Sequence, residues 1–265
     1  KSIGQGGFQE VEQMAAFKDM VAYQEEVRDP TRIAEVLNRV ITKARRMSAP
    51  AQINIPRDIW TQVVDIELPE IIEFELPAGG TGAISSAAKL LSDAKFPVIL
   101  NGAGVILGNA IPASQALAER LDSPVCCNYQ HNDAFPGSHP LFVGPLGYNG
   151  SKAAMELIKE ADVVLALGTR LNPFSTLPGY NLDYWPNEAK LIQVDINPDR
   201  IGLTKPVSVG IVGDARQVAE QILSRLAEKA GDAGREERRK LIARKKAVWA
   251  ETLDSMDFEQ DDPGT

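Results

Sequence analysis

The sequence predicts an α/β protein: a doubly wound parallel sheet, preceded by part of a second α/β domain. Two observations indicate this class. Short apolar runs without strict alternation recur five times between Phe96 and Asp214, as strands covered on both faces require. Helical patterns fill several of the gaps, and strands that alternate with helices pair in parallel. The predicted strands cover residues 97–104, 124–128, 162–170, 190–196 and 207–214.

The first segment, residues 1–62, is interpreted as the C-terminal part of one domain. Asp29 followed by Pro30 predicts a helix start, because Asp caps helices and Pro suits the first helical position. The run 51–55 predicts a strand after this helix. One helix between two strands is too little for an independent domain, so we expect a partner to cover it. The apolar face of the helix is formed by Ile33, Val36, Leu37, Val40, Ile41 and Ala44.

The remaining boundaries follow from composition. Residues 63–80 are rich in Glu and Pro and contain two adjacent glycines, which predicts a linker. Residues 81–230 form the predicted middle domain. It begins with a helix that turns Ile84, Ala87, Ala88 and Leu91 inward and ends with a helix capped by Asp214. Residues 231–265 are interpreted as a linker towards a missing domain, because their acidic end has few apolar residues. Their basic stretch 235–246 is interpreted as a solvated helix face.

Composition excludes several classes of protein. The 265 residues carry a net charge of −8, which argues against a nucleic-acid partner. No apolar stretch reaches the length of a membrane span, so no membrane partner is expected. The two cysteines, Cys126 and Cys127, are adjacent in a predicted buried strand and cannot easily bridge to each other. We therefore expect a soluble, cytoplasmic protein with reduced thiols.

The segment Asn101-Gly-Ala-Gly-Val-Ile-Leu-Gly108 lies between a predicted strand and a helix, where a loop can cradle a phosphate. Its glycine spacing is one residue longer than the dinucleotide fingerprint. Asn128 stands where that fingerprint expects an acidic residue at the end of the next strand. The glycines equally suit a tight strand-to-helix turn. Both interpretations stay open.

The two histidines, His131 and His139, lie in a loop rich in Asn, Pro and Gly. Neither has the spacing of a metal ligand, so no metal site is predicted in this chain. A hydrogen-bonding role is favoured over acid–base chemistry for both. Asp195 ends a predicted strand. It can cap the next turn or accept a hydrogen bond from a ribose.

Four segments in fixed order carry a family resemblance: Gly6–Glu10, Ala49–Asp58, Gly168–Arg170 and Val194–Pro198. Together they resemble the thiamine-diphosphate enzymes of the acetolactate synthase type, over essentially the whole chain. Within that family, Tyr129–His139 and Gly144–Lys152 look most like the sulfoacetaldehyde acetyltransferases.

The resemblance implies a parent enzyme with a pyrimidine-binding, a middle and a diphosphate-binding domain. Residues 1–62 would then end the first domain, and 81–230 would be the second. The parent would use thiamine diphosphate and Mg²⁺ to convert sulfoacetaldehyde and phosphate to acetyl phosphate and sulfite, as a homodimer or homotetramer. The segments that hold both cofactors would lie outside this sequence, so we expect the chain alone to be inactive. The alternatives are an acetolactate synthase-like carboligase and a non-catalytic nucleotide-binding or structural module.

The resemblance also implies site residues. Phe8 and Gln9 match a family segment that reaches the active centre, whereas Gln9 could instead cap the next helix. In acetolactate synthases the matching strand ends bind FAD, and Ser151 can cap the helix beside them. For this chain the resemblance implies an empty cleft rather than one filled by FAD or ADP. The residues of this vestigial nucleotide pocket are Gly102, Gly104, Gly147, Asn149, Gly150, Arg170 and Asp195.

Overall fold

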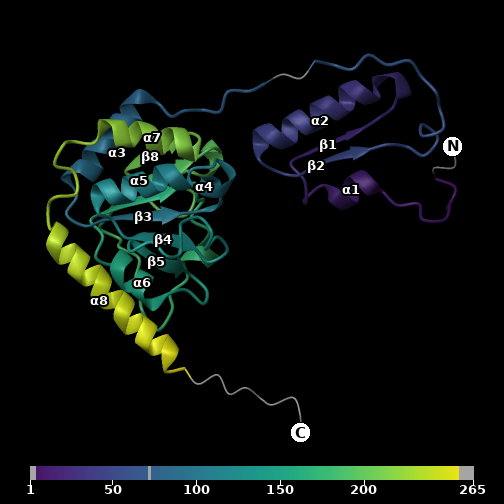
Figure 1. Cartoon of the computed structure of the whole chain (residues 1–265). Coiled ribbons are helices and arrows are strands. Elements are labelled where there is room, and N and C mark those ends of the chain that lie inside the picture. The colour runs from purple at the N-terminus through teal and green to yellow at the C-terminus, as the bar shows by residue number, and fades with distance from the viewer. Residues whose placement is uncertain (1–3, 71–72, 257–265) are drawn as a thin grey trace, which may run out of the picture. The chain divides into compact units, whose positions relative to one another are not determined.

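The computed structural model describes residues 4–70 and 73–256, and it divides into two compact units after Glu75 (Figure 1). This division falls within the predicted linker, residues 63–80. Residues 1–3, 71–72 and 257–265, which belong to the predicted first segment, linker and final segment, lie outside the described residues. The assignment of each segment to a domain of a larger enzyme stays a prediction.

The first unit contains one β–α–β element. Strands β1 (Tyr23–Glu26) and β2 (Ala51–Asn54) pair in parallel, and helix α2 (Ile33–Met47) connects them. The predicted cap is confirmed: an Asp29 carboxylate oxygen accepts the Thr31 N–H at 2.9 Å. The turn that it caps is the 3-10 helix η1 (Pro30–Arg32), which leads directly into α2. A short helix, α1 (Gln13–Phe17), precedes β1.

The core of the first unit is small. Its buried apolar side chains among the described residues are Val27, Val36, Val40 and Ile59. The predicted apolar face of α2 is only partly covered. Val40 is 5 % exposed, whereas Leu37 and Ile41 are 44 % and 48 % exposed. Part of this apolar face is buried and part is exposed, because a two-stranded sheet is too narrow to cover the full apolar stripe of the helix.

The second unit is built on a six-stranded parallel sheet in the order β5-β4-β3-β6-β7-β8. The predicted doubly wound fold class is confirmed. The prediction of five strands was incomplete, because β5 contains Gly144 and Pro145, which interrupt the apolar pattern. Such residues are tolerated at a sheet edge. The strands are β3 (Pro97–Asn101), β4 (Val125–Asn128), β5 (Phe142–Leu146), β6 (Val163–Leu167), β7 (Lys190–Asp195) and β8 (Val209–Val212).

Helices cover this sheet. Helices α3 (Thr81–Asp93) and α5 (Ile111–Leu121) both pack against α7 (Ala215–Arg225), and α6 (Lys152–Ile158) packs against α8 (Arg235–Asp254). A five-residue helix, α4 (Ala103–Leu107), follows β3. The predicted inward residues of α3 are confirmed as buried: Ile84, Ala87, Ala88 and Leu91.

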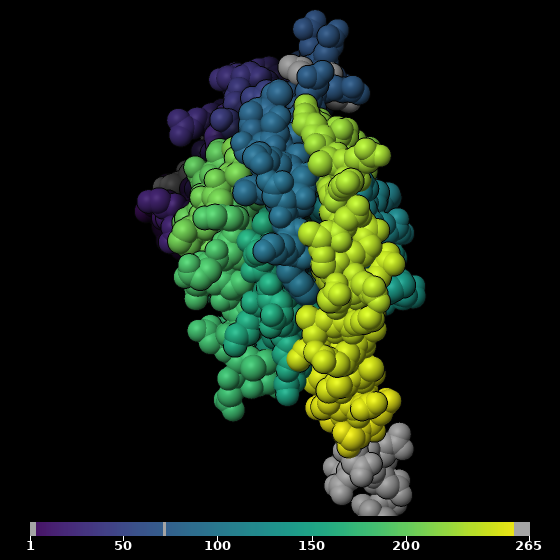
Figure 2. Space-filling view, turned by 90° about the vertical axis from the view of Figure 1, so that its left-hand side faces the viewer, coloured from purple at the N-terminus to yellow at the C-terminus, as the bar shows by residue number. Residues whose placement is uncertain are grey.

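Helix α8 departs from its prediction as a solvated face. Figure 2 shows α8, in yellow, as a continuous ridge along the second unit. Arg238 is only 1 % exposed, so the prediction is wrong at this position. The buried guanidinium donates its hydrogen bonds to backbone carbonyls, an arrangement that the charge pattern of the sequence does not reveal. Two further 3-10 helices, η2 (Pro173–Thr176) and η3 (Pro198–Arg200), follow β6 and β7.

Candidate functional site

The strand-end cluster lies where the sheet order reverses. Strands β3 and β6 are neighbours in the sheet, and the chain leads from them to opposite edges. Ligands of doubly wound sheets bind at this switch point, beyond the carboxyl ends of the strands. The segment Gly102–Gly104, which is the N-cap residue and first two residues of α4, follows β3, and the loop Gly168–Arg170 follows β6. The structure therefore brings together two of the predicted strand ends.

The glycines of these two segments pack backbone against backbone. The Gly102 N–H donates to the Leu167 carbonyl at 3.0 Å, and the Gly104 N–H donates to the Gly168 carbonyl at 2.9 Å. A Cβ on Gly104 would lie 2.7 Å from the Gly168 Cα. Both amides are thus engaged within the fold. This geometry supports the tight-turn interpretation of the glycines over a phosphate cradle.

Asn128 lies at the end of β4 and joins the cluster through Thr169. The Asn128 Nδ2 donates to the Thr169 Oγ1 at 2.9 Å, and this hydroxyl also accepts the Leu171 N–H at 3.1 Å. The Asn128 Oδ1 is buried and has no hydrogen-bond partner among the described residues. From the sequence, Asn128 stands only where the dinucleotide fingerprint has an acidic residue. Its position at a strand end was the signal that could have identified it as part of the cluster.

Arg170 and Asp195 contribute charge at the same edge. The Arg170 side chain is exposed, and Asp195 is half-buried at the end of β7. One Asp195 carboxylate oxygen accepts the Asn197 N–H at 2.9 Å, so it caps the following turn. Burial raises the pKa of Asp195, and the Asn197 bond and the Arg200 and Arg170 charges act in the opposite direction.

The loop Gly147–Gly150 follows β5 and packs against η2. A Cβ on Gly147 would lie 2.7 Å from the Ser175 carbonyl, so the approach requires glycine. The predicted cap of α6 is confirmed, because the Ser151 Oγ accepts the Ala154 N–H at 3.2 Å. Asn149, between the two glycines of this loop, is exposed and has a φ of 52°.

An aromatic group beside this loop was not predicted. The Phe174 ring lies between those of Tyr129 and Tyr148, with centroid distances of 5.3 Å and 5.4 Å. The three residues come from the loops after β6, β4 and β5. They are far apart in sequence, and no local pattern in the sequence indicates that they meet.

Phe8 and Gln9 belong to the first unit, and Phe8 is 95 % exposed. Glu10 closes their loop, where a carboxylate oxygen accepts the Gly7 N–H at 3.0 Å. The alternative role of Gln9 as a helix cap is wrong. Helix α1 begins at Gln13 with Glu12 as its N-cap residue and has no side-chain cap.

His139 has the predicted hydrogen-bonding role. Its Nε2 lies 3.1 Å from a Glu119 carboxylate oxygen, and its Nδ1 accepts the Leu141 N–H at 3.1 Å. The backbone N–H of His131 donates to the Asn128 carbonyl at 2.9 Å. Within residues 4–70 and 73–256, no group of three or more His, Cys, Asp or Glu side chains could hold a metal ion. No described helix is long and apolar enough to cross a membrane.

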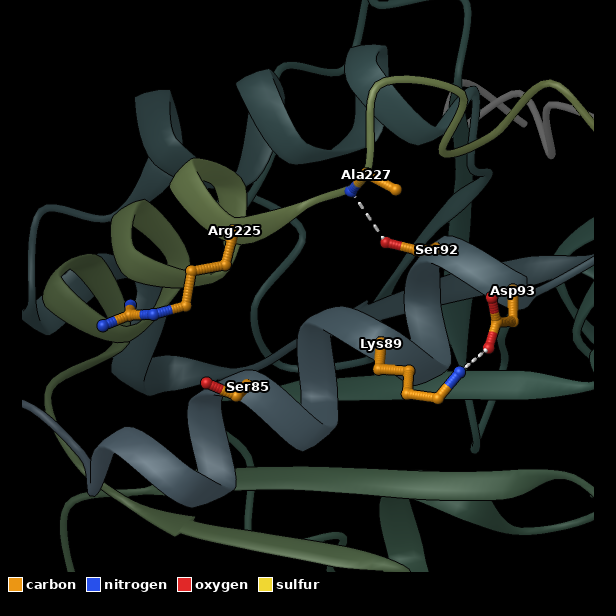
Figure 3. Close-up of a pocket in the computed structure, with 6 residues that line it drawn as sticks. All are labelled: Ser85, Lys89, Ser92, Asp93, Arg225 and Ala227. Carbon is orange, nitrogen blue, oxygen red and sulfur yellow. Dashed lines mark hydrogen bonds and ion pairs between the residues drawn. The ribbon is translucent and has the colours of Figure 1, made fainter.

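A surface hollow of about 490 Å³ lies between α3 and α7, away from the strand-end cluster (Figure 3). The Lys89 ammonium pairs with Asp93 at 2.6 Å, and the Ser92 Oγ accepts the Ala227 N–H at 3.0 Å. In Figure 3 the Arg225 guanidinium points away from Lys89, so the two cations do not converge on one point. A second hollow, of about 410 Å³, lies in the first unit beside Gln24 and Glu26.

Comparison with known proteins identifies the family. The family described as "Thiamine pyrophosphate enzyme, central domain" matches residues 84–222. A sulfoacetaldehyde acetyltransferase of Roseovarius nubinhibens is 76 % identical over the whole chain, which covers 44 % of that relative. A probable sulfoacetaldehyde acetyltransferase of Rhizobium meliloti is 74 % identical over the whole chain, which covers 45 % of that relative.

The solved structure of benzoylformate decarboxylase from Polynucleobacter necessarius has a similar fold. The TM-score is 0.70 at 21 % identity, over 83 % of this chain and 41 % of that one. This likeness supports the fold alone. The chain spans less than half the length of the two curated relatives above. The match over residues 84–222, which covers most of the second unit, shows that this chain belongs to the thiamine pyrophosphate enzyme family and contains its central domain.

Proposed function

We propose that this chain is part of a thiamine-diphosphate-dependent acetyltransferase that converts sulfoacetaldehyde and phosphate to acetyl phosphate and sulfite. One observation carries the proposal: a sulfoacetaldehyde acetyltransferase and a probable one align with the whole chain at 76 % and 74 % identity. The substrates are those of the whole enzyme, of which this chain spans less than half.

The described residues do not fit thiamine diphosphate with its magnesium ion. They contain no group of three or more His, Cys, Asp or Glu side chains that could hold a metal ion, and the amides of Gly102 and Gly104 donate to backbone carbonyls of β6 and its following turn. We therefore assign no chemical step to this chain. Its role in the proposed enzyme is to supply the central domain, and Phe8 and Gln9 are the residues proposed to face the active centre.

The proposal has a direct test in the complete gene product that contains this chain. With sulfoacetaldehyde, phosphate, thiamine diphosphate and Mg²⁺, we expect release of sulfite and formation of acetyl phosphate. Release of carbon dioxide from pyruvate without sulfite would replace the proposal by an acetolactate synthase-like carboligase. If neither reaction occurs, the non-catalytic module is the better description.

The 265-residue chain alone is expected to release no more sulfite than a control without protein. The physical reason is that its described residues contain no group of three or more His, Cys, Asp or Glu side chains that could hold the metal ion. Sulfite is measured under the conditions used for the complete protein. Release well above that control would show that the chain holds a working active centre and would contradict this assignment.

We keep the vestigial nucleotide pocket as a second, weaker proposal for Gly102, Gly104, Gly147, Asn149, Gly150, Arg170 and Asp195. The buried, unpartnered Asn128 Oδ1 supports it. The engaged glycine amides argue against a bound diphosphate. Titration calorimetry with FAD and ADP is therefore expected to give no heat at millimolar ligand. Micromolar binding that is lost in Arg170→Ala would establish an occupied pocket.

A homodimer or homotetramer is proposed for the complete enzyme. The exposed Leu37 and Ile41 on α2 support it, because apolar surface of this kind is commonly covered by a partner. The proposed cytoplasmic location is supported by Cys126 and Cys127, which are both free and buried. Light scattering on the complete protein tests the assembly, and a stable monomer would contradict it.

A further inference from the structure

Helix α8 is attached to the second unit near its beginning. The Arg238 guanidinium donates to the carbonyls of Lys95 and Asp122, at 2.6 Å and 2.8 Å. These residues precede β3 and β4, so this anchor lies at the amino edge of the sheet. Asp122 adds ion pairs to Arg235 and Arg239, at 3.8 Å and 2.5 Å.

The same helix reaches the opposite edge. Its 20 residues span about 30 Å. Midway, the Lys245 ammonium pairs with Glu156 of α6 at 2.8 Å. Near its end, the half-buried Trp249 meets the Tyr180 ring edge-on, with a centroid distance of 5.5 Å and an interplanar angle of 66°. Aromatic pairs favour this geometry.

Tyr180 in turn holds the loop after β5. Its hydroxyl donates to the Gly150 carbonyl at 2.9 Å. Gly150 immediately precedes Ser151, the cap of α6, and the Gly150 N–H donates to the Gly147 carbonyl at 2.9 Å. Tyr180 and Asn181 have φ values of 54° and 58°, a conformation that side chains other than glycine rarely adopt. A conformation of this kind persists only where its surroundings hold it in place.

We propose that Tyr180 and Trp249 form a latch through which the end of α8 sets the conformation of the Gly147–Gly150 loop. The aromatic contact holds Tyr180 in its left-handed conformation, and the hydroxyl then restrains the loop through the Gly150 carbonyl. A displacement of the end of α8 releases this hydroxyl and loosens the loop at the carboxyl edge of the sheet. Tyr180 is thus a positioning residue, one hydrogen bond away from the loop that it controls.

Hydrogen exchange of the 265-residue chain tests the latch. The reporters are the amides of Gly150 and Ser151, which donate to the carbonyls of Gly147 and Pro145. Tyr180→Phe retains the ring and removes only the hydroxyl. We expect it to speed exchange at both amides about fivefold, the factor that one hydrogen bond contributes to an equilibrium. Exchange in residues 235–254 stays unchanged, because the contact with Trp249 remains.

Variants of α8 separate the latch from a general loss of packing. Trp249→Ala is expected to speed exchange at Gly150 and Ser151 by a similar factor, and Trp249→Phe is expected to restore most of the protection. Val248→Ala is the matched control, because Val248 is the exposed neighbour of Trp249 and is expected to change nothing. In the Tyr180→Phe background, Trp249→Ala is expected to add less than about twofold, because coupled residues are not additive.

Two results would overturn the latch. The first is unchanged exchange at Gly150 and Ser151 in Tyr180→Phe, a variant too mild to prevent folding. The second is a Trp249→Ala effect that is equally large with and without the Tyr180 hydroxyl. In that case α8 acts on the loop by another route.

Discussion

Arg238 uses all five of its N–H donors on backbone carbonyls, as a buried guanidinium must. Burial lowers its pKa, and the nearby Asp122 carboxylate acts in the opposite direction. The accepting carbonyls lie at the C-terminal end of α5 and in the turns before β3 and α8. One side chain therefore supplies hydrogen-bond donors to the backbone carbonyls of three separate turns. The five acceptors are Lys95, Leu121, Asp122, Gly231 and Ala233.

Arg238→Ala is expected to lower the free energy of unfolding of the second unit by about 3 kcal/mol or more, because buried carbonyls lose their donors. Arg238→Lys retains three donors, so its free energy of unfolding is expected to lie between those of the unaltered chain and Arg238→Ala. Urea denaturation measures the change. Arg244→Ala, at an exposed position of the same helix, serves as the control and is expected to stay within about 0.5 kcal/mol. Equal effects at both positions would show that the buried guanidinium contributes nothing specific.

Gly168 occupies a position where two requirements coincide. Its φ is 61°, and an added Cβ would lie 2.7 Å from the Gly104 Cα. Gly168→Ala is therefore expected to cost about 2 kcal/mol or more, from backbone strain and steric overlap together. Gly202→Ala isolates the strain, since Gly202 has a φ of 73° and a Cβ there would meet no atom within 4 Å. This control is expected to cost about 1 kcal/mol. Equal costs in urea denaturation would argue against tight packing of Gly168 on Gly104.

At the scale of elements, an ion pair holds α2 on β1: the Glu25 carboxylate of β1 accepts hydrogen bonds from Arg39 of α2 and from the Tyr23 hydroxyl. Arg39 donates to both Glu25 carboxylate oxygens, at 2.8 Å and 2.6 Å, and the Tyr23 hydroxyl donates to one of them at 2.7 Å. The bonds from Arg39, followed by the bond from Tyr23, lower the pKa of Glu25 from 4.5 to about 2. Arg39 also pairs with Glu35 on its own helix.

The lowered pKa of Glu25 makes the folding stability of the first unit depend on pH. A carboxyl group whose pKa is lower in the folded state stabilises the fold fully above its unfolded pKa. The first unit is therefore expected to lose stability as the pH falls from about 4.5 towards 2, and Glu25→Gln is expected to flatten this dependence. Hydrogen exchange of residues 23–54 measures it. Glu67→Gln, at an exposed position, is the control. If Glu25→Gln keeps the full acid dependence, the ion pair is not its cause.

Elements with continuous apolar runs could be predicted from the sequence, and the others could not. Strands β3, β4, β6, β7 and β8 lie within the predicted runs, and the caps of α6 and α7 are the predicted Ser151 and Asp214. Strand β5 was missed because Gly144 and Pro145 break its pattern. Gly144 is required there, since a Cβ would lie 2.6 Å from the Ser151 Cβ. This close contact is with the cap residue of α6, and the residue pattern of the strand alone does not indicate where α6 lies.

The candidate site was predictable as a location but not as a set of contacts. The parallel topology is sufficient to place Gly102, Gly104, Arg170 and Asp195 at one edge. Whether the glycine N–H groups are free to bind a ligand depends on the pairing of β3 with β6, which aligns Asn101 with Leu167. The aromatic group around Phe174 depends on three loops at once. Such contacts depend on the tertiary fold, and no periodicity along the chain encodes them.

At the scale of the whole molecule, the two units have very different cores. The first unit buries four apolar side chains among its described residues, whereas the second buries apolar side chains from all six strands. Hydrophobic stabilisation grows with the apolar area removed from water, so the second unit is the more stable. Separate cores also allow separate unfolding transitions.

Unfolding of the chain in urea is therefore expected to proceed in two steps, with the first unit unfolding at the lower concentration. Val40→Ala, in the small core, is expected to move only the first step, by about 1–2 kcal/mol. Leu165→Ala, in the large core, is expected to move only the second, by about 2–5 kcal/mol. Hydrogen exchange of peptides from residues 23–54 and 84–222 assigns each step to its unit. A single transition that both variants shift equally would mean that the two cores unfold as one.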